Sequence, residues 1–203
     1  MSTVKHAIRN RWTNEVLFEC EVPDGMASGL RTRHVLEQAV KARANLASAN
    51  LTGAYLTGAN LTGAYLTGAN LAGANLTGAY LAGAYLTGAY LTGAYLTGAY
   101  LTGANLTGAY LTGANLAGAK WRDGVIINKA PVQVSGLLWF VTILDAHMQI
   151  GCELHSLADW ASFDDRRIVE MGGRDALRFW RENKETLLSL ARAAGRSFEA
   201  QTA

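Results

Sequence analysis

Residues 44–118 read ANLAS-ANLTG-AYLTG-ANLTG-AYLTG-ANLAG-ANLTG-AYLAG-AYLTG-AYLTG-AYLTG-AYLTG-ANLTG-AYLTG-ANLAG, an unbroken run of fifteen pentads. A degenerate pentad, AKWRD, follows at 119–123. Every Lys, Arg, Asp and Glu of the chain lies outside 44–118, so this segment is uncharged and its five-residue period must decide how it folds.

The period rules out both a helix and a flat strand. In a helix, a Leu at every fifth position advances by about 140° per repeat and makes no apolar stripe. A Gly in nearly every pentad would also cost about 1 kcal/mol relative to Ala. In a strand, an odd period swaps the two faces at each repeat. The pattern works if the chain turns a corner once per pentad. Ala and Leu then point inward, Asn or Tyr and Thr point outward, and Gly takes the corner because it tolerates positive φ.

With pentads of this A(N/D)LxG type, the chain resembles the pentapeptide-repeat proteins. The resemblance implies a mainly β protein, a right-handed quadrilateral β-solenoid with four pentads, or 20 residues, in each coil. About four coils would then span 44–123, and the tube would be roughly 20 Å long. The residue before Leu, often Asp or Asn in the family, is only Asn or Tyr here until Lys120.

The charged flanks predict mixed α/β caps at both ends of the solenoid. An open end exposes apolar side chains and unpaired backbone, which favours aggregation. The expected domains are an N-terminal cap at 1–43, the solenoid at 44–123 and a C-terminal cap at 124–203. In the N-terminal cap, the patterns predict strands at 4–12 and 15–22 and a helix at 31–42.

The C-terminal flank predicts short strands followed by two helices. The strands are expected at 125–128, 132–136 and 139–144, with a further one around 148–152. The first helix, 157–171, is stopped by Gly172-Gly173, and the second runs over 175–194. In the second helix, Leu177, Trp180, Leu187 and Ala191 form an apolar stripe that either packs on the cap or forms a homodimer contact.

Composition favours a cytoplasmic protein without a membrane or nucleic-acid partner. Cys20 and Cys152 are too few for a disulfide framework. The first residues lack the apolar run of a signal peptide, and the longest apolar stretch, SGLLWFVTIL at 135–144, is far shorter than the roughly 20 residues of a membrane helix. A net charge of +2 gives no general attraction to nucleic acid or acidic membranes.

A weak candidate metal site lies at His147, Cys152 and His155, with Asp145 and Asp159 nearby in the sequence. Imidazole and thiolate are suitable zinc ligands, but the spacing matches no standard finger and no fourth ligand is evident. Two alternatives are a core role for Cys152, which falls in an apolar strand pattern, and a Cys-His nucleophile pair. We expect no metal, no other cofactor and no catalytic residue.

The tyrosines form the candidate interaction surface. All eight occupy the outward position before Leu, and a 20-residue coil would place Tyr65 over Tyr85, Tyr80 over Tyr100, and Tyr90 over Tyr110. The rings either stabilise neighbouring coils or contact a protein partner. The residues proposed for that contact are Tyr65, Tyr80, Tyr85, Tyr90, Tyr95, Tyr100 and Tyr110.

The leading function hypothesis is therefore a non-enzymatic scaffold or protein-interaction module. The alternative comes from the resemblance, because some pentapeptide-repeat proteins mimic DNA and bind type II topoisomerases. Such mimicry needs a rod of negative charge, and 44–118 contains no Asp or Glu. Ice binding through Thr is a third class, but each face offers one Thr column beside Asn or Tyr, not a paired array.

Overall fold

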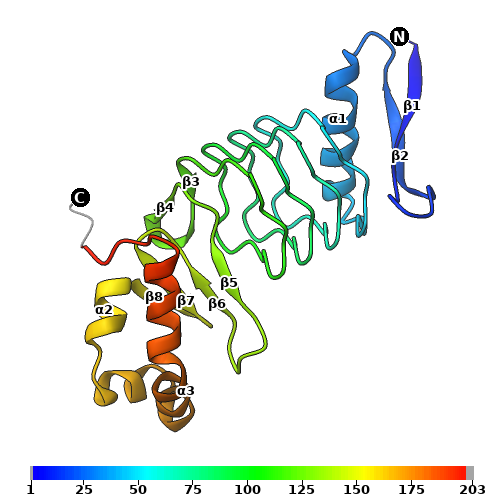
Figure 1. Ribbon diagram of the computed structural model, residues 1–203. Helices are drawn as coiled ribbons and strands as arrows, with labels where there is room; N and C mark the ends of the chain where they lie inside the picture. Colours follow the sequence, from blue (N-terminus) through cyan, green and yellow to red (C-terminus); the bar gives the residue numbers. More distant parts are fainter. Residues whose placement is uncertain (1, 200–203) are drawn as a thin grey trace. The chain divides into compact units, whose positions relative to one another are not determined.

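The computed structural model describes residues 2–199, which form two compact units (Figure 1). The first unit ends at Ala130 and the second begins at Pro131. The first unit contains the repeats and the elements before them. The second contains a small antiparallel sheet and two helices. Among the described residues, no helix is both long enough and apolar enough to span a bilayer.

The repeats form a β-solenoid in which the chain returns to the same face every 20 residues. Parallel bridges join the residue before each Leu to its counterpart 20 positions later, beginning with Asn45 and Tyr65 and ending with Tyr100 and Lys120. Figure 1 shows the successive turns lying side by side between α1 and β3. The predicted 20-residue repeat of the coil is therefore present.

Side chains inside and outside the coils follow the predicted alternation. The repeat leucines from Leu46 to Leu101 are each at most 1% exposed, and most of the repeat alanines are also buried. The repeat glycines have φ between +62° and +69°, and Ser48, which replaces the first of them, has φ +59°. The corner thus needs a left-handed residue, which Gly adopts without the steric cost of a Cβ.

Backbone hydrogen bonds join each coil to the next. In a typical pentad, the backbone N–H of Leu donates to the carbonyl of an outward residue in the next coil. The N–H of Gly donates to the carbonyl of the residue that precedes the Gly of the next coil. For Leu91 and Gly93, the acceptors are the carbonyls of Tyr110 and Thr112, at 2.8 and 2.9 Å. The outward residue donates back to an Ala carbonyl of the preceding coil, and so the ladder uses three inter-coil bonds per pentad.

A hairpin and a helix precede the repeats. Strands β1 (Thr3–Arg9) and β2 (Val16–Pro23) pair antiparallel, and α1 (Ser28–Lys41) packs against both. Helix α1 begins three residues before the predicted start, because Arg31 lies in its first turn, where its guanidinium donates to the carbonyls of Asp24 and Met26.

Three short elements follow the last pentad. Strand β3 (Ala119–Lys120) pairs antiparallel with β4 (Ile126–Ile127), across the 3-10 turn η1 (Arg122–Gly124). Trp121, which occupies the Leu position of the degenerate pentad at 119–123, is buried.

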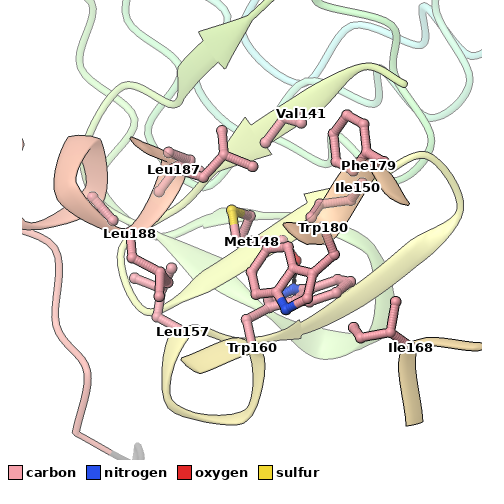
Figure 2. Close-up of a cluster of buried hydrophobic side chains, with 12 residues drawn as sticks. Val141, Met148, Ile150, Leu157, Trp160, Ile168, Phe179, Trp180, Leu187 and Leu188 are labelled. Carbon is pink, nitrogen blue, oxygen red and sulfur yellow. Dashed lines mark hydrogen bonds between the residues drawn. The ribbon is translucent and has the colours of Figure 1, made fainter. Parts of the chain in front are cut away.

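The second unit is a four-stranded antiparallel sheet covered by two helices. The strand order is β5 (Val132–Val134), β6 (Val141–Ile143), β7 (His147–Ile150) and β8 (Glu153–Ser156). Helices α2 (Leu157–Ser162) and α3 (Asp165–Ala193) follow. Figure 2 shows their shared core, in which the indole rings of Trp160 and Trp180 lie together with centroids 5.0 Å apart.

The structure corrects two of the predicted elements in this unit. The helix predicted at 157–171 is interrupted at Phe163, because Asp164 caps the next helix by accepting a hydrogen bond from the N–H of Arg167. The strand predicted around 148–152 ends at Ile150, where Gly151 adopts φ +57° and turns the chain into β8. The predicted break at Gly172 and Gly173 is present, since both have non-helical backbone angles within α3.

Burial of the repeat leucines can be tested with two neighbouring substitutions. Leu91 is 0% exposed, so Leu91→Asp places a charge without a partner in the interior, and we expect a loss of several kcal/mol of stability. Thr92 is exposed, and Thr92→Asp should change the unfolding free energy by less than about 0.5 kcal/mol. Circular dichroism with urea unfolding measures both, and equal damage would contradict the inward and outward assignment.

Candidate interaction surface

Tyrosine rings stack in pairs along three of the four columns of outward residues. Ring centroids lie 5.0 Å apart for Tyr65 and Tyr85, with an interplanar angle of 6°. The corresponding distance is 4.7 Å for Tyr80 with Tyr100, and also for Tyr90 with Tyr110. All three predicted pairs are therefore confirmed. The separation matches the spacing between neighbouring strands, so the backbone ladder itself brings the rings into contact.

A cation stands at the end of two of these stacks. The guanidinium carbon of Arg11 lies 4.0 Å from the ring centre of Tyr90, and the Nζ atom of Lys120 lies 4.1 Å from that of Tyr100. Lys120 also donates a hydrogen bond of 2.9 Å to the hydroxyl of Tyr100. These cation–π contacts occupy ring faces that would otherwise be open to a ligand.

Asparagine at the outward position has a different role from tyrosine. The Oδ1 atom of each repeat Asn accepts a hydrogen bond from the backbone N–H two residues later, as in Asn75 to Thr77 at 3.1 Å. This local bond fixes the turn, as in an Asx-turn. The residues that make it are Asn45, Asn50, Asn60, Asn70, Asn75, Asn105 and Asn115. Tyr cannot make this bond and contributes ring stacking instead.

The stack of Tyr65 and Tyr85 borders a hollow of about 320 Å³ beside the end of α1. Arg43 and Val40 also line this hollow. Within residues 2–199, the Arg43 side chain forms no ion pair, and it is exposed. An aromatic pair beside an exposed guanidinium is the most distinctive part of the repeat surface, and we call Arg43, Tyr65 and Tyr85 the Arg-Tyr patch.

The other tyrosines are distributed over the remaining faces. Tyr95 is 54% exposed, and its column neighbours are Asn75 and Asn115, so it has no stacking partner there. Tyr55 lies against α1, where a Cβ on Gly29 would be 3.2 Å from its ring. The tyrosine columns follow from the period of the sequence, but the position of Arg43 beside two of the tyrosines does not. No local pattern shows that the chain passes this residue again 20 and 40 positions later.

The candidate metal residues do not come together. The register of β7 and β8 pairs Met148 with His155, so His147 and His155 project from opposite faces of the sheet. Cys152 is exposed in the turn between these strands, which corrects the expectation of a core position. In the part of the chain that the structure describes, no group of three or more His, Cys, Asp and Glu side chains is arranged to hold a metal ion.

The two histidines have separate structural environments. His155 Nε2 lies 2.9 Å from Glu153 Oε2, and the imidazole packs edge-on against the rings of Trp160 and Phe163. His147 is half-buried, and its Nδ1 atom has no hydrogen-bond partner within 2–199. Burial lowers the pKa of His147 from its ordinary value of 6.5, although the carboxylate of Asp159 acts in the opposite direction.

Comparison with known proteins identifies one matching family model and several similar solved structures. The model of the family described as Pentapeptide repeats matches residues 44–81 and 79–118 in 8 copies. A pentapeptide repeat protein from Nostoc Pcc 7120 is 40% identical over 46% of this chain and 83% of its own chain, with a TM-score of 0.40. No curated protein matches the chain.

Two further solved structures match a shorter share of their own length. A pentapeptide repeat protein from the cyanobacterium Cyanothece 51142 is 37% identical over 41% of this chain and 60% of its own, with a TM-score of 0.25. HetL from Nostoc sp. strain PCC 7120, described as involved in heterocyst differentiation regulation, is 43% identical over 38% of this chain and 40% of its own, with a TM-score of 0.16.

The environment of His147 leads to a pH prediction. Because the folded state favours the neutral imidazole, this histidine contributes stability above pH 6.5 that is lost as the pH falls from 6.5 through the lowered folded pKa. The unfolding free energy of the wild-type protein should therefore fall more steeply between pH 7.5 and pH 5 than that of His147→Gln. Urea unfolding followed by tryptophan fluorescence measures both slopes, and identical slopes would contradict the assignment.

Proposed function

Because the chain belongs to the pentapeptide-repeat family, we propose that it is a non-enzymatic scaffold that binds another protein through its outer repeat surface. The observation that carries this proposal is the Arg-Tyr patch. Proteins of this family are structural repeat proteins, and residues 44–118 of this chain contain no Asp, Glu, Lys, Arg, His or Cys to act as a catalytic acid, base or thiol nucleophile. A cytoplasmic location belongs to the same proposal.

The Arg-Tyr patch has the composition of a protein-binding site. Tyr and Arg are enriched in protein interfaces and among the residues that contribute most to binding. Tyr65 and Tyr85 are 44% and 46% exposed, and their stacking already restricts the rings before a partner arrives. Less conformational entropy is then lost on association. We expect the partner to offer an apolar side chain to the rings and a carboxylate to Arg43.

Charge argues against a nucleic-acid mimic as the function. The coils present uncharged Asn, Tyr and Thr side chains. The charged side chains that contact or border the first and last coils are mostly cations, namely Arg11, Arg33, Arg43 and Lys120, with the Glu37 carboxylate as an anion. A surface of this kind does not reproduce the dense negative charge of a phosphate backbone. The favoured partner is therefore a protein surface with few charges.

The finer architecture forms part of the proposal. We infer about four coils over 44–123, with an N-terminal cap at 1–43 and a C-terminal cap at 124–203. An N-terminal cap is supported because residues within 1–43 provide acceptors for backbone N–H groups of the first coil. In the later coils, the preceding coil provides the acceptors for these groups. The N–H of Asn50 donates to the carbonyl of Arg9 at 2.8 Å, and the N–H of Asn60 donates to the Glu37 carboxylate at 3.0 Å.

Two arginines satisfy further groups of the first coil. Arg33 donates to the carbonyls of Thr57 and Gly58, at 2.8 and 3.3 Å. The backbone N–H of Arg11 donates to the carbonyl of Ser48 at 2.8 Å. At the other end, the backbone N–H groups of Leu106, Leu111 and Leu116 have no hydrogen-bond partner within 2–199, so this edge of the ladder is open to a covering element.

A homodimer contact through 175–194 stays a prediction. The apolar stripe that suggested it is largely buried within its own unit, where Trp180, Leu187 and Ala191 belong to one core and Leu177 packs against that core partly buried. This arrangement supports the alternative that the stripe packs on its own unit, and we keep the dimer as the less favoured interpretation.

The Arg-Tyr patch can be tested with substitutions that the repeat itself tolerates. Asn occupies the same position in other pentads, so the double variant Tyr65→Asn with Tyr85→Asn should keep the fold and lose partner binding by at least about tenfold. The matched control is Tyr95→Asn, which makes the same change on another face. Affinity capture from cells with quantitative mass spectrometry, followed by titration of the enriched protein, measures the effect.

The interaction proposal would be wrong if the wild-type protein enriches no protein over the double variant, or if Tyr95→Asn reduces binding equally. Circular dichroism and thermal unfolding of each variant must first show that the fold is retained. Arg43→Gln should reduce binding on its own by severalfold, because it removes the cation while keeping most of the side-chain length.

The N-terminal cap can be tested without shortening the chain. Leu36 is fully buried in α1, so Leu36→Asp should detach the helix and expose the edge of the first coil. We expect concentration-dependent association in light scattering. The control is Ala42→Asp, which adds the same charge at an exposed residue at the end of the helix and should leave the protein unassociated. A soluble, unassociated Leu36→Asp variant with an intact solenoid signal would contradict the capping role.

A further inference from the structure

The second unit contains an apolar pocket of about 410 Å³, which neither the family match nor the proposed function uses. It lies among the turn between β7 and β8, helix α2 and the broken part of helix α3. Trp139, Trp160, Phe179 and Trp180 contribute the aromatic lining. Small-molecule sites in proteins are concave, mostly apolar and roughly 300–1,000 Å³ in volume, so this pocket is of the right size and character.

Small residues in the wall leave the space empty. Gly172 interrupts α3 with φ −158° and ψ 25°, and a Cβ built on it would lie 3.0 Å from the Cβ of Ala176. Gly151 has positive φ in the turn opposite, and a Cβ there would lie 3.7 Å from the Trp139 ring. A side chain at Gly151 would be strained by the positive φ, and one at Gly172 would crowd the Cβ of Ala176, so glycine is favoured at both positions and adds no side-chain atoms to the wall.

The aromatic walls are held in place by their own contacts. The indole N–H of Trp160 donates a hydrogen bond of 2.7 Å to the carbonyl of Met148, drawn as a dashed line in Figure 2. The ring of Trp139 packs edge-on against Phe179 with centroids 5.1 Å apart. Figure 2 shows Ile150 near Phe179 and Trp180, and Ile168 on the side of Trp160. A ligand would therefore meet an aromatic surface that is already formed.

Charge at the pocket indicates the chemistry of the ligand. Among the described residues that line it, Glu153 is the only one with a charged side chain. One of its oxygens, Oε2, lies 2.9 Å from His155 Nε2, while Oε1 accepts no hydrogen bond within 2–199. A carboxylate oxygen with spare acceptor capacity beside indole rings favours a cation, through charge-assisted hydrogen bonding and cation–π attraction, and disfavours an anion.

We propose that this pocket binds a small hydrophobic amine, whose apolar body lies among Trp139, Trp160 and Trp180 and whose ammonium group pairs with Glu153. The proposal concerns the second unit alone and does not depend on the interaction surface of the repeats. A failure of either proposal therefore leaves the other standing.

Three probes with the same body and different charge test the proposal. These are 3-phenylpropylamine, propylbenzene and 3-phenylpropanoate, titrated into the full chain at pH 8 and followed by tryptophan fluorescence and calorimetry. We expect the amine to bind at least tenfold more tightly than the carboxylate, with propylbenzene between them. Binding of the amine no tighter than that of propylbenzene or the carboxylate, or binding of none of the three, would overturn the proposal.

Three variants locate the binding. Glu153→Gln should weaken amine binding at least fivefold and leave propylbenzene unchanged. The control Glu170→Gln removes an exposed charge that does not line the pocket and should change neither affinity. Ala176→Phe should fill the pocket and abolish binding of all probes, with the fold checked by circular dichroism. Retained amine affinity in Glu153→Gln would overturn the assignment even if Ala176→Phe does not fold.

Discussion

Backbone hydrogen bonding between successive coils is the constraint on which the whole repeat unit depends. Each N–H and C=O that leaves the solvent needs a partner, and for three backbone N–H groups of a typical pentad the partner lies one coil away. The chain can meet this requirement only if it returns to the same face every 20 residues, and it does so because a left-handed corner follows each Leu by two residues. The corner in turn confines Ala and Leu to the interior, where their burial stabilises the stack.

The same constraint leaves the outward side chains free to vary, which is where a binding function can reside. Backbone pairing sets the distance between neighbouring outward residues, so two tyrosines at the same position of successive coils stack whether or not the protein uses them. Asparagine in the same position fixes its own turn through a local hydrogen bond. The choice between the two residues changes the surface with little effect on the coil, and a scaffold can thus acquire a patch such as Arg43, Tyr65 and Tyr85 without redesign of its core.

The second unit follows a different physical rule from the repeats. Its sheet is short, and its stability depends on a core of large side chains from β6, β7, α2 and α3. Irregular packing of large rings around glycine turns leaves space, whereas the repetition of Ala and Leu in the coils fills it. The apolar pocket accordingly lies in the second unit, beside Gly151 and Gly172, while the hollows on the repeat unit lie on its outer surface, beside residues of α1.

The order of amino acids was enough to predict the repeat, the inward Leu and Ala, the glycine corners and the three tyrosine stacks, because a period of five residues has few solutions that pair the backbone and bury one face. It also indicated the hairpin and helix before the repeats and the break at Gly172 and Gly173. The folded chain was needed to show that Arg43 lies beside Tyr65 and Tyr85, that His147 and His155 face opposite sides of their sheet, and that Cys152 is exposed in a turn. These placements depend on where a helix ends against a coil and on the register of one hairpin. A local sequence pattern does not show where the helix ends against the coil, because contacts between residues far apart in the chain fix that point. It does not show the hairpin register either, because the position of the turn determines which residues of the two strands pair.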